Sequence, residues 1–203
     1  MKKNKISKNW INRQKKDIYV RKSKLEGYRS RAVYKLIEID KKFKILKNGI
    51  SLLDIGAAPG SWSQYVSKKI KNGKILSTDL KKIEPINNVV HLEGDFTQEL
   101  HQESIKKYLK SKIDVILSDM AENTTGNKIV DSISTGELCK EAIFFAKNML
   151  NKNGTFVSKI FMGSSFNEII TESRLIFKQI KVFKPPSSRK NSKESFIICK
   201  FLR

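Results

Sequence analysis

Apolar side chains recur along the chain with two different periods. Spacing of three to four positions predicts amphipathic helices over residues 29–43, 62–70, 134–150 and 167–177. Short apolar runs predict strands over residues 50–53, 74–78, 89–92, 113–117 and 155–161, and a final strand pair over 178–183 and 195–201. This alternation of strands and helices, ending in a hairpin, predicts an α/β fold whose sheet is mostly parallel with one antiparallel strand.

Small residues follow the first predicted strand, where positions 54–62 read Asp-Ile-Gly-Ala-Ala-Pro-Gly-Ser-Trp. Gly56, Ala57 and Gly60 carry no side chain large enough to keep a flat ligand away from the main chain. In doubly wound sheets, a turn of this kind at the carboxyl end of a strand binds cofactors. A tight connection between a strand and a helix has the same composition, so the turn alone leaves both interpretations open.

Carboxylates close three consecutive predicted strands. Asp54 follows the predicted strand 50–53 and is expected to face a ligand ammonium group. Asp79 follows the strand 74–78 at the spacing of a carboxylate that accepts from a ribose. Asp95 closes the strand 89–92 and is expected to reach an adenine edge. The full G-x-G-x-x-G spacing that seats a pyrophosphate on a helix N-terminus is missing. S-adenosylmethionine has no phosphate and needs no such seat, so the pattern favours S-adenosylmethionine over a dinucleotide.

Length and composition bound the other possibilities. The 203 residues suit one domain, and they show no linker-like segment, secretory signal or apolar run of membrane-spanning length. Cys139, Cys199, His91 and His101 lack the spacing of metal ligands. We therefore expect an intracellular monomer without a metal or a membrane partner, and the sequence leaves open whether it acts in the cytoplasm or in an organelle such as the mitochondrion.

The net charge of +21 is concentrated at both ends of the chain. Residues 1–50 contain 17 basic and 4 acidic side chains, residues 151–203 contain 11 and 3, and the hundred residues between them sum to zero. Two basic ends around a neutral centre favour a nucleic-acid surface, although a lysine-rich solvated surface is the alternative.

Four charged residues occupy positions that usually hold other residue types. Lys35 lies within the apolar stretch of the first helix, and Lys159 interrupts an otherwise buried strand. Asp119 closes the central strand, and Glu194 precedes the last one. Taken singly, each residue also fits an ordinary role as a solvated lysine, a helix cap or a loop residue.

Five motifs, in order, resemble the FtsJ (RrmJ) family of ribosomal RNA 2′-O-ribose methyltransferases. They are Arg-Ser-Arg-Ala-Val-Tyr-Lys-Leu at 29–36, the glycine turn at 54–64, Ser-Asp-Met-Ala at 118–121, Lys-Ile-Phe-Met-Gly at 159–163, and Ser-Ser-Arg at 187–189 followed by Glu194. The resemblance runs from about Trp10 to the C-terminus and implies a Rossmann-like class I methyltransferase fold with a seven-stranded sheet. Residues 29–203 would form this domain, and residues 1–28 a basic RNA-binding extension. Ser61 replaces a glycine usual in the family, and Glu122 a proline.

The resemblance also implies the roles of individual residues. A Lys-Asp-Lys-Glu tetrad falls on Lys35, Asp119, Lys159 and Glu194. The expected cofactor contacts are Asp54, Gly56, Ala57, Pro59, Gly60, Ser61, Trp62, Asp79, Leu80, Asp95, Phe96 and Asp119. Arg29, Arg31 and Arg189 are expected to bind RNA, together with the basic segments 2–24 and 181–193.

The chemistry of ribose methylation suits these residue types. A 2′-hydroxyl is a weak nucleophile until a base removes its proton, and Lys159 is the proposed base. A lysine acts as a base where burial and a neighbouring cation favour its neutral form, and Lys35 can be that cation. Asp119 would orient the Lys159 amine, and Glu194 would position Lys35 or the ribose.

The sequence therefore predicts S-adenosylmethionine-dependent 2′-O-methylation of RNA. A uridine of large-subunit ribosomal RNA, methylated within the subunit or its precursor, is the target that the resemblance implies. A 2′-O-methyltransferase that acts on the tRNA anticodon loop or on the mRNA cap remains an alternative, since the tetrad does not exclude either. An RNA-binding ribosome-assembly factor is the alternative from another functional class.

Overall fold

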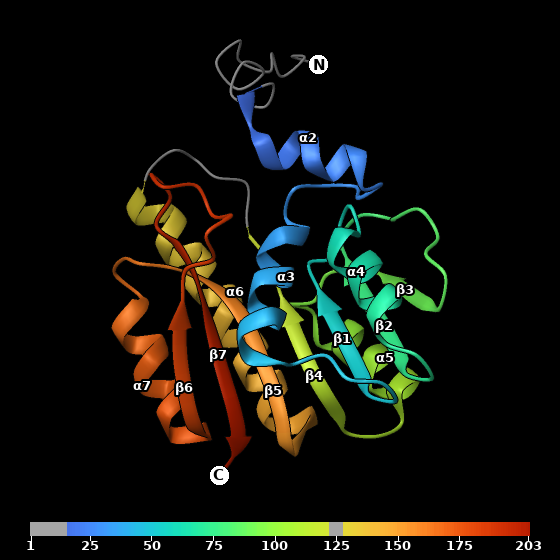
Figure 1. The fold of residues 1–203 in the computed structure, drawn as a ribbon. Helices are drawn as coiled ribbons and strands as arrows, with labels where there is room; N and C mark the ends of the chain where they lie inside the picture. The colour runs from blue at the N-terminus through green and yellow to red at the C-terminus, as the bar shows by residue number, and fades with distance from the viewer. Residues whose placement is uncertain (1–15, 122–127) are drawn as a thin grey trace, which may run out of the picture.

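The computed structural model describes residues 16–121 and 128–203. Seven strands form one sheet in the order β3-β2-β1-β4-β5-β7-β6 (Figure 1). They are β1 Ser51–Ile55, β2 Lys74–Asp79, β3 Val89–Glu93, β4 Ile113–Ser118, β5 Leu150–Phe161, β6 Phe177–Phe183 and β7 Glu194–Leu202. β7 is antiparallel to both of its neighbours, whereas β1 to β5 pair in parallel. The predicted fold class, with its one antiparallel strand, is confirmed.

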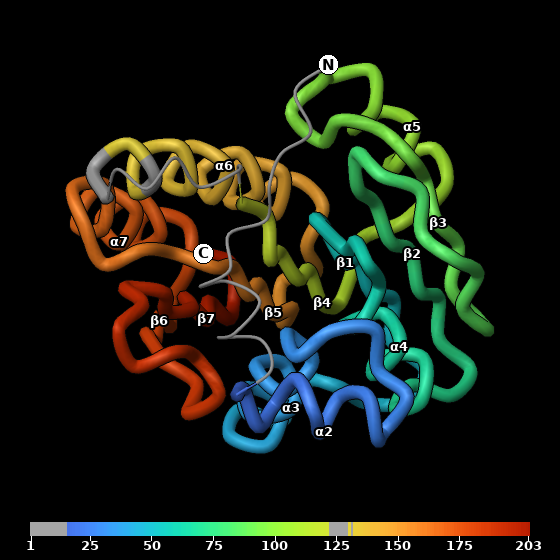
Figure 2. Tube along the Cα trace, turned by 90° about the horizontal axis from the view of Figure 1, so that it is seen from above, coloured from blue at the N-terminus to red at the C-terminus, as the bar shows by residue number. Residues whose placement is uncertain are grey.

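Helices cover both faces of this sheet (Figure 2). They are α2 Ile18–Leu25, α3 Val33–Phe43, α4 Ser61–Lys69, α5 Glu99–Leu109, α6 Lys128–Met149 and α7 Phe166–Ile176. One apolar cluster joins α3 and α4 to the sheet, and a second joins α5, α6 and α7 to the opposite face. Strand alternation divides β1 between the two clusters: Leu52 packs toward α3 and α4, while Leu53 and Ile55 pack toward the other helices.

Several predicted boundaries were wrong. The first helix begins at Val33 instead of residue 29, and α6 begins six residues before its predicted start. The helices α2 and α5 were not predicted; α5 buries only Ile105 and Leu109, so its apolar period is weak. β1 extends to Ile55, which places Asp54 within the strand and not at its end.

Some sequence features lie outside the described residues. These are Trp10 and the rest of the basic extension before residue 16, and Glu122. Within the described residues, no helix has both the length and the apolar character needed to span a membrane.

Candidate active site

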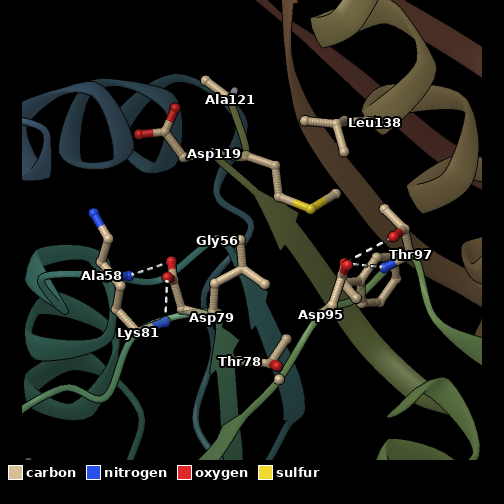
Figure 3. A pocket seen from close by; sticks show the side chains of 14 residues that line it. Gly56, Ala58, Thr78, Asp79, Lys81, Asp95, Thr97, Asp119, Ala121 and Leu138 are labelled. Atoms are coloured by element: carbon tan, nitrogen blue, oxygen red, sulfur yellow. Dashed lines mark hydrogen bonds between the residues drawn. The ribbon is translucent and has the colours of Figure 1, made fainter. Parts of the chain in front are cut away.

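A cavity of about 560 Å³ opens at the carboxyl ends of β1, β2, β3 and β4 (Figure 3). Its lining consists of Gly56, Ala58, Thr78, Asp79, Leu80, Lys81, Gly94, Asp95, Phe96, Thr97, Asp119, Met120, Ala121 and Leu138. The strand order reverses between β1 and β4, and open α/β sheets bind ligands at such a switch point. The volume lies within the usual range for small-molecule sites, about 300 to 1,000 Å³.

Two backbone amides hold the carboxylate of Asp79 in place (Figure 3). Its Oδ2 accepts a hydrogen bond from the Ala58 N–H, and its Oδ1 accepts one from the Lys81 N–H, both at 2.9 Å. Each carboxylate oxygen can accept a second hydrogen bond. Asp79 is therefore a fixed bidentate acceptor that suits the two hydroxyls of a ribose.

Asp95 lies across the cavity from Asp79 (Figure 3). Its Oδ1 accepts hydrogen bonds from the Thr97 hydroxyl at 2.7 Å and from the Thr97 N–H at 2.9 Å. These bonds, the hydroxyl's above all, lower the pKa of Asp95, so this carboxylate remains an ionised acceptor. The neighbouring Phe96 is buried against Phe145, with ring centroids 5.2 Å apart, and offers a fixed apolar wall.

Close backbone packing requires a glycine at position 56. Gly56 has a φ of +75°, and a Cβ there would lie 2.8 Å from the Met120 backbone nitrogen. Met120 therefore packs directly against the main chain of the turn. A larger residue would displace the loop that carries Asp119.

Half of the expected cofactor contacts line this cavity, namely Gly56, Asp79, Leu80, Asp95, Phe96 and Asp119. The other six, Asp54, Ala57, Pro59, Gly60, Ser61 and Trp62, belong to the strand, turn and helix behind it. Trp62 is buried in the core and its Nε1–H donates to the Ala32 carbonyl at 2.8 Å. Ser61 is also buried, with its hydroxyl 2.8 Å from that of Ser30.

Asp54 is fully buried and points toward α4. Its Oδ2 accepts a hydrogen bond from the Ser63 hydroxyl at 2.6 Å, while Oδ1 has no hydrogen-bond partner among the described residues. Burial raises the pKa of Asp54 to about 7, and the nearby charges of Asp119 and Asp79 act in the same direction. The expectation that Asp54 faces a ligand ammonium group assumed that the strand ends at Asp54. In the structure β1 ends at Ile55, so Asp54 lies within the strand.

The structure brings the four residues of the expected tetrad together. Lys159 Nζ lies 3.1 Å from Asp119 Oδ1 and donates to the Asp119 carbonyl at 2.6 Å. Lys35 Nζ lies 4.0 Å from Asp119 Oδ2 and donates to Glu194 Oε2 at 2.6 Å. The charges thus form a row in which lysines and carboxylates alternate. The side chain of Lys159 is only 7% exposed, whereas Asp119 is 17% exposed where it meets the cavity.

Mutual pairing sets the ionisation of this row. Burial alone would lower the pKa of Lys35, but the charges of Asp119 and Glu194 outweigh burial and raise the pKa. Burial alone would raise the pKa of Asp119, but Lys159 and Lys35 together keep it below its usual range. Lys35 is therefore a permanent cation and Asp119 a permanent anion at neutral pH.

The three arginines expected to bind RNA are engaged with the protein itself. Arg29 donates to main-chain carbonyls of two loops. Arg31 pairs with Asp17 and donates to the Ser187 carbonyl. Arg189 Nη2 lies 3.7 Å from Asp17 Oδ2, with 38% of its side chain exposed.

Sequence reasoning gave no role to several residues of the site, among them Ala58, Lys81 and Thr97, which fix the cavity carboxylates, and Ser188. The Ser188 hydroxyl donates to Glu194 Oε1 at 2.7 Å and so fixes the carboxylate that holds Lys35. Ser188 belongs to the Ser-Ser-Arg motif at 187–189, one of the motifs that carry the family resemblance. The arginine of this motif has a predicted role, but its serines have none.

Comparison with known proteins agrees with this arrangement. The FtsJ-like methyltransferase family model matches residues 28–202. The Pelagibacter ubique protein named ribosomal RNA large subunit methyltransferase E is 64% identical over 203 residues, covering 100% of both chains. The Rickettsia akari protein of the same name is 47% identical over 198 residues, covering 95% of this chain and 87% of that protein.

Solved structures share the architecture. A crystal structure described as a ribosomal RNA methyltransferase from Plasmodium falciparum has a TM-score of 0.77 and 36% identity, covering 86% of this chain and 98% of that chain. A Streptococcus mutans protein described as a methyltransferase, solved in complex with SAH, has a TM-score of 0.55 and 14% identity, covering 82% of this chain and 97% of that chain. The second likeness concerns the fold alone. With the family model matching nearly all of the described residues, the chain belongs to the FtsJ-like methyltransferase family.

Proposed function

We propose that this chain transfers a methyl group from S-adenosylmethionine to a ribose 2′-hydroxyl of RNA, and that its target is a uridine of large-subunit ribosomal RNA. One observation carries the proposal. Asp119 lines the cavity that suits a nucleoside and is also the central member of the Lys-Asp-Lys-Glu row. Cofactor and acceptor would therefore meet at one carboxylate.

The cavity fits an adenosyl group. Asp79 has two fixed carboxylate oxygens that would accept the ribose hydroxyls, Asp95 would accept from the adenine edge, and Phe96 would supply an apolar wall. S-adenosylmethionine, when bound, supplies an electrophilic methyl group on a cationic sulfur. The anionic Asp119 lies at the cavity wall, where it would favour that positive charge.

The four charged residues divide the remaining tasks. Lys159, in its neutral form, accepts the proton of the 2′-hydroxyl, and Asp119 fixes the position of its amine through the contacts at 3.1 and 2.6 Å. Lys35 keeps its charge and offers hydrogen bonds to the ribose oxygens. Glu194, itself held by Ser188, keeps Lys35 in place.

Charge and relatives together support RNA as the substrate. Only RNA offers a 2′-oxygen, and the basic ends of the chain suit its phosphates. The names of the Pelagibacter and Rickettsia relatives support large-subunit ribosomal RNA as the target over tRNA or a cap. An assembly factor without catalysis would have no need of an intact tetrad.

Methyl transfer from labelled S-adenosylmethionine tests the proposal. Large ribosomal subunits, free ribosomal RNA, tRNA and capped RNA are offered separately, and the product is mapped by its resistance to alkaline hydrolysis. We expect label in large-subunit RNA at a uridine 2′-oxygen. Label only in tRNA or in a cap would overturn the target, and no label in any RNA would overturn the enzymatic function.

Lys159→Ala tests the proposed base, and Lys152→Ala is its control because Lys152 is an exposed lysine of the same strand. We expect Lys159→Ala to abolish transfer while RNA binding and cofactor binding persist. Lys152→Ala should retain transfer. Normal turnover by the Lys159 variant would refute its role as the base.

A further inference from the structure

Arg29 joins two loops beside the cavity. Its Nη1 donates to the Pro59 carbonyl at 3.1 Å and to the Glu84 carbonyl at 2.9 Å. Its Nη2 donates to the Pro85 carbonyl at 3.1 Å. The first carbonyl belongs to the glycine turn after β1, and the other two belong to the segment that follows β2. One planar cation therefore bridges the turn that carries Ala58 and the segment that follows Asp79.

The main chain around Arg29 is fixed to the start of α4. The Arg29 N–H donates to Gln64 Oε1 at 2.9 Å, and the Gln64 amide donates back to the Gly27 carbonyl at 3.2 Å. The Ser30 and Ser61 hydroxyls lie 2.8 Å apart. Arg29 thus projects from an anchored segment, so its guanidinium has a defined position and not that of a free surface side chain.

The glycine at position 60 leaves the space that this guanidinium occupies. A Cβ at Gly60 would lie 2.7 Å from Arg29 Nη1 and 3.0 Å from Ile86 Cδ1. Gly60 also has a φ of +100°, which a larger residue rarely adopts. Gly60 does not line the cavity, so a Cβ here would meet Arg29 and Ile86 on the outside of the turn.

We propose that Arg29 is a positioning residue for the cofactor and not a phosphate contact. Through Pro59 it holds the neighbouring Ala58, whose N–H orients the Asp79 carboxylate. Through the Glu84 and Pro85 carbonyls it holds the segment that continues from Asp79. Arg29 thereby sets the distance between the turn after β1, whose Ala58 orients the ribose acceptor Asp79, and the segment that follows Asp79. This inference rests on the proposed use of S-adenosylmethionine.

Replacing Arg29 by lysine separates charge from geometry. A lysine keeps the positive charge that an RNA phosphate would attract, but it lacks the planar fork that reaches three carbonyls. The matched control is Arg174→Lys, the same replacement at an exposed arginine of α7. Thermal midpoints of all variants establish that they fold. Arg29→Ala is the stronger replacement. If the alanine variant does not fold, Arg29→Lys alone decides whether Arg29 positions the cofactor site.

Two binding measurements and one exchange measurement form the test. Calorimetric titration with S-adenosylhomocysteine should show Arg29→Lys binding about tenfold more weakly than the parent protein, since small misplacements of positioning groups have large effects. Affinity for ribosomal RNA should be unchanged, and Arg174→Lys should match the parent protein in both titrations. In the ligand-free protein, hydrogen exchange at the Gly60 amide, which donates to the Ala57 carbonyl, should be faster in Arg29→Lys.

Other outcomes overturn the inference. Parental affinity of Arg29→Lys for S-adenosylhomocysteine would show that the bridge does not position the cofactor site. Weaker RNA binding with parental cofactor affinity would establish Arg29 as a phosphate contact. If the parent protein binds no S-adenosylhomocysteine, the proposed function fails, and the inference fails with it for that separate reason.

Discussion

Replacing Asp54 by asparagine should remove a pH-dependent destabilisation from the folded protein. The Asp54 carboxyl is fully buried, and burial raises its pKa from 3.8 to about 7. Between these two values the folded state binds more protons than the unfolded chain does. The free energy of unfolding therefore falls as the pH rises through this window.

The size of the effect follows from the two pKa values. A shift of about 3 units corresponds to about 4 kcal/mol once the pH is well above 7. Integration between pH 5 and pH 8 gives a loss of about 2.5 kcal/mol. Asparagine does not ionise, so Asp54→Asn avoids this loss. Its Oδ1 can still accept the Ser63 hydrogen bond, although its buried amide adds a constant cost that does not depend on pH.

Urea unfolding of the ligand-free protein at pH 5, 6, 7 and 8 measures the effect. The unfolding free energy of Asp54→Asn minus that of the parent protein should rise by about 2.5 kcal/mol across this range. Ser63→Ala removes a hydrogen bond that lowers the pKa of Asp54, so the fall in its unfolding free energy should continue to a higher pH than in the parent protein. Parallel pH profiles for the parent protein and Asp54→Asn would refute the argument.

Three further predictions concern the residues around the cavity. Gly56→Ala should lower the unfolding free energy by about 1 to 3 kcal/mol in urea titrations, because its φ is +75° and its Cβ would lie 2.8 Å from Met120. Ser188→Ala should lower kcat about tenfold in methyl-transfer assays with little change in cofactor affinity, because Glu194 loses a hydrogen bond. Burial lowers the pKa of His101, so stability should decline as the pH falls below about 6.5; His101→Gln should flatten that decline in thermal melts.

The central strands β1, β2 and β4 were predictable from sequence because they are short apolar runs that are buried on both faces. α5 was missed for the opposite reason, since two buried residues in eleven leave little helical period. The boundary of β1 shows the limit of this reasoning. With β1 extended by two residues, Asp54 lies within the strand on the same face as Leu52, and its carboxyl meets Ser63 of α4.

The site was predictable only in part. Spacing of 84, 40 and 35 residues between the tetrad members carries no distance information, and the resemblance alone brought Lys35, Asp119, Lys159 and Glu194 together. Sequence also treats every arginine in a basic segment as a candidate phosphate contact. What a guanidinium touches depends on loops far away in sequence, and Arg29 reaches carbonyls 30, 55 and 56 positions along the chain.

In the alternating row of charges, Lys159, the proposed base, depends on Glu194, which it does not need to contact. Glu194 and Asp119 share Lys35, while Lys35 and Lys159 share Asp119. Without Glu194, Lys35 would have Asp119 as its remaining carboxylate in the row and would draw that carboxylate away from Lys159. The Lys159 amine would then lose the partner that orients it. Glu194 thus acts on proton transfer at Lys159 through Lys35 and Asp119, the two charges that lie between Glu194 and Lys159. Ser188 in turn acts through Glu194.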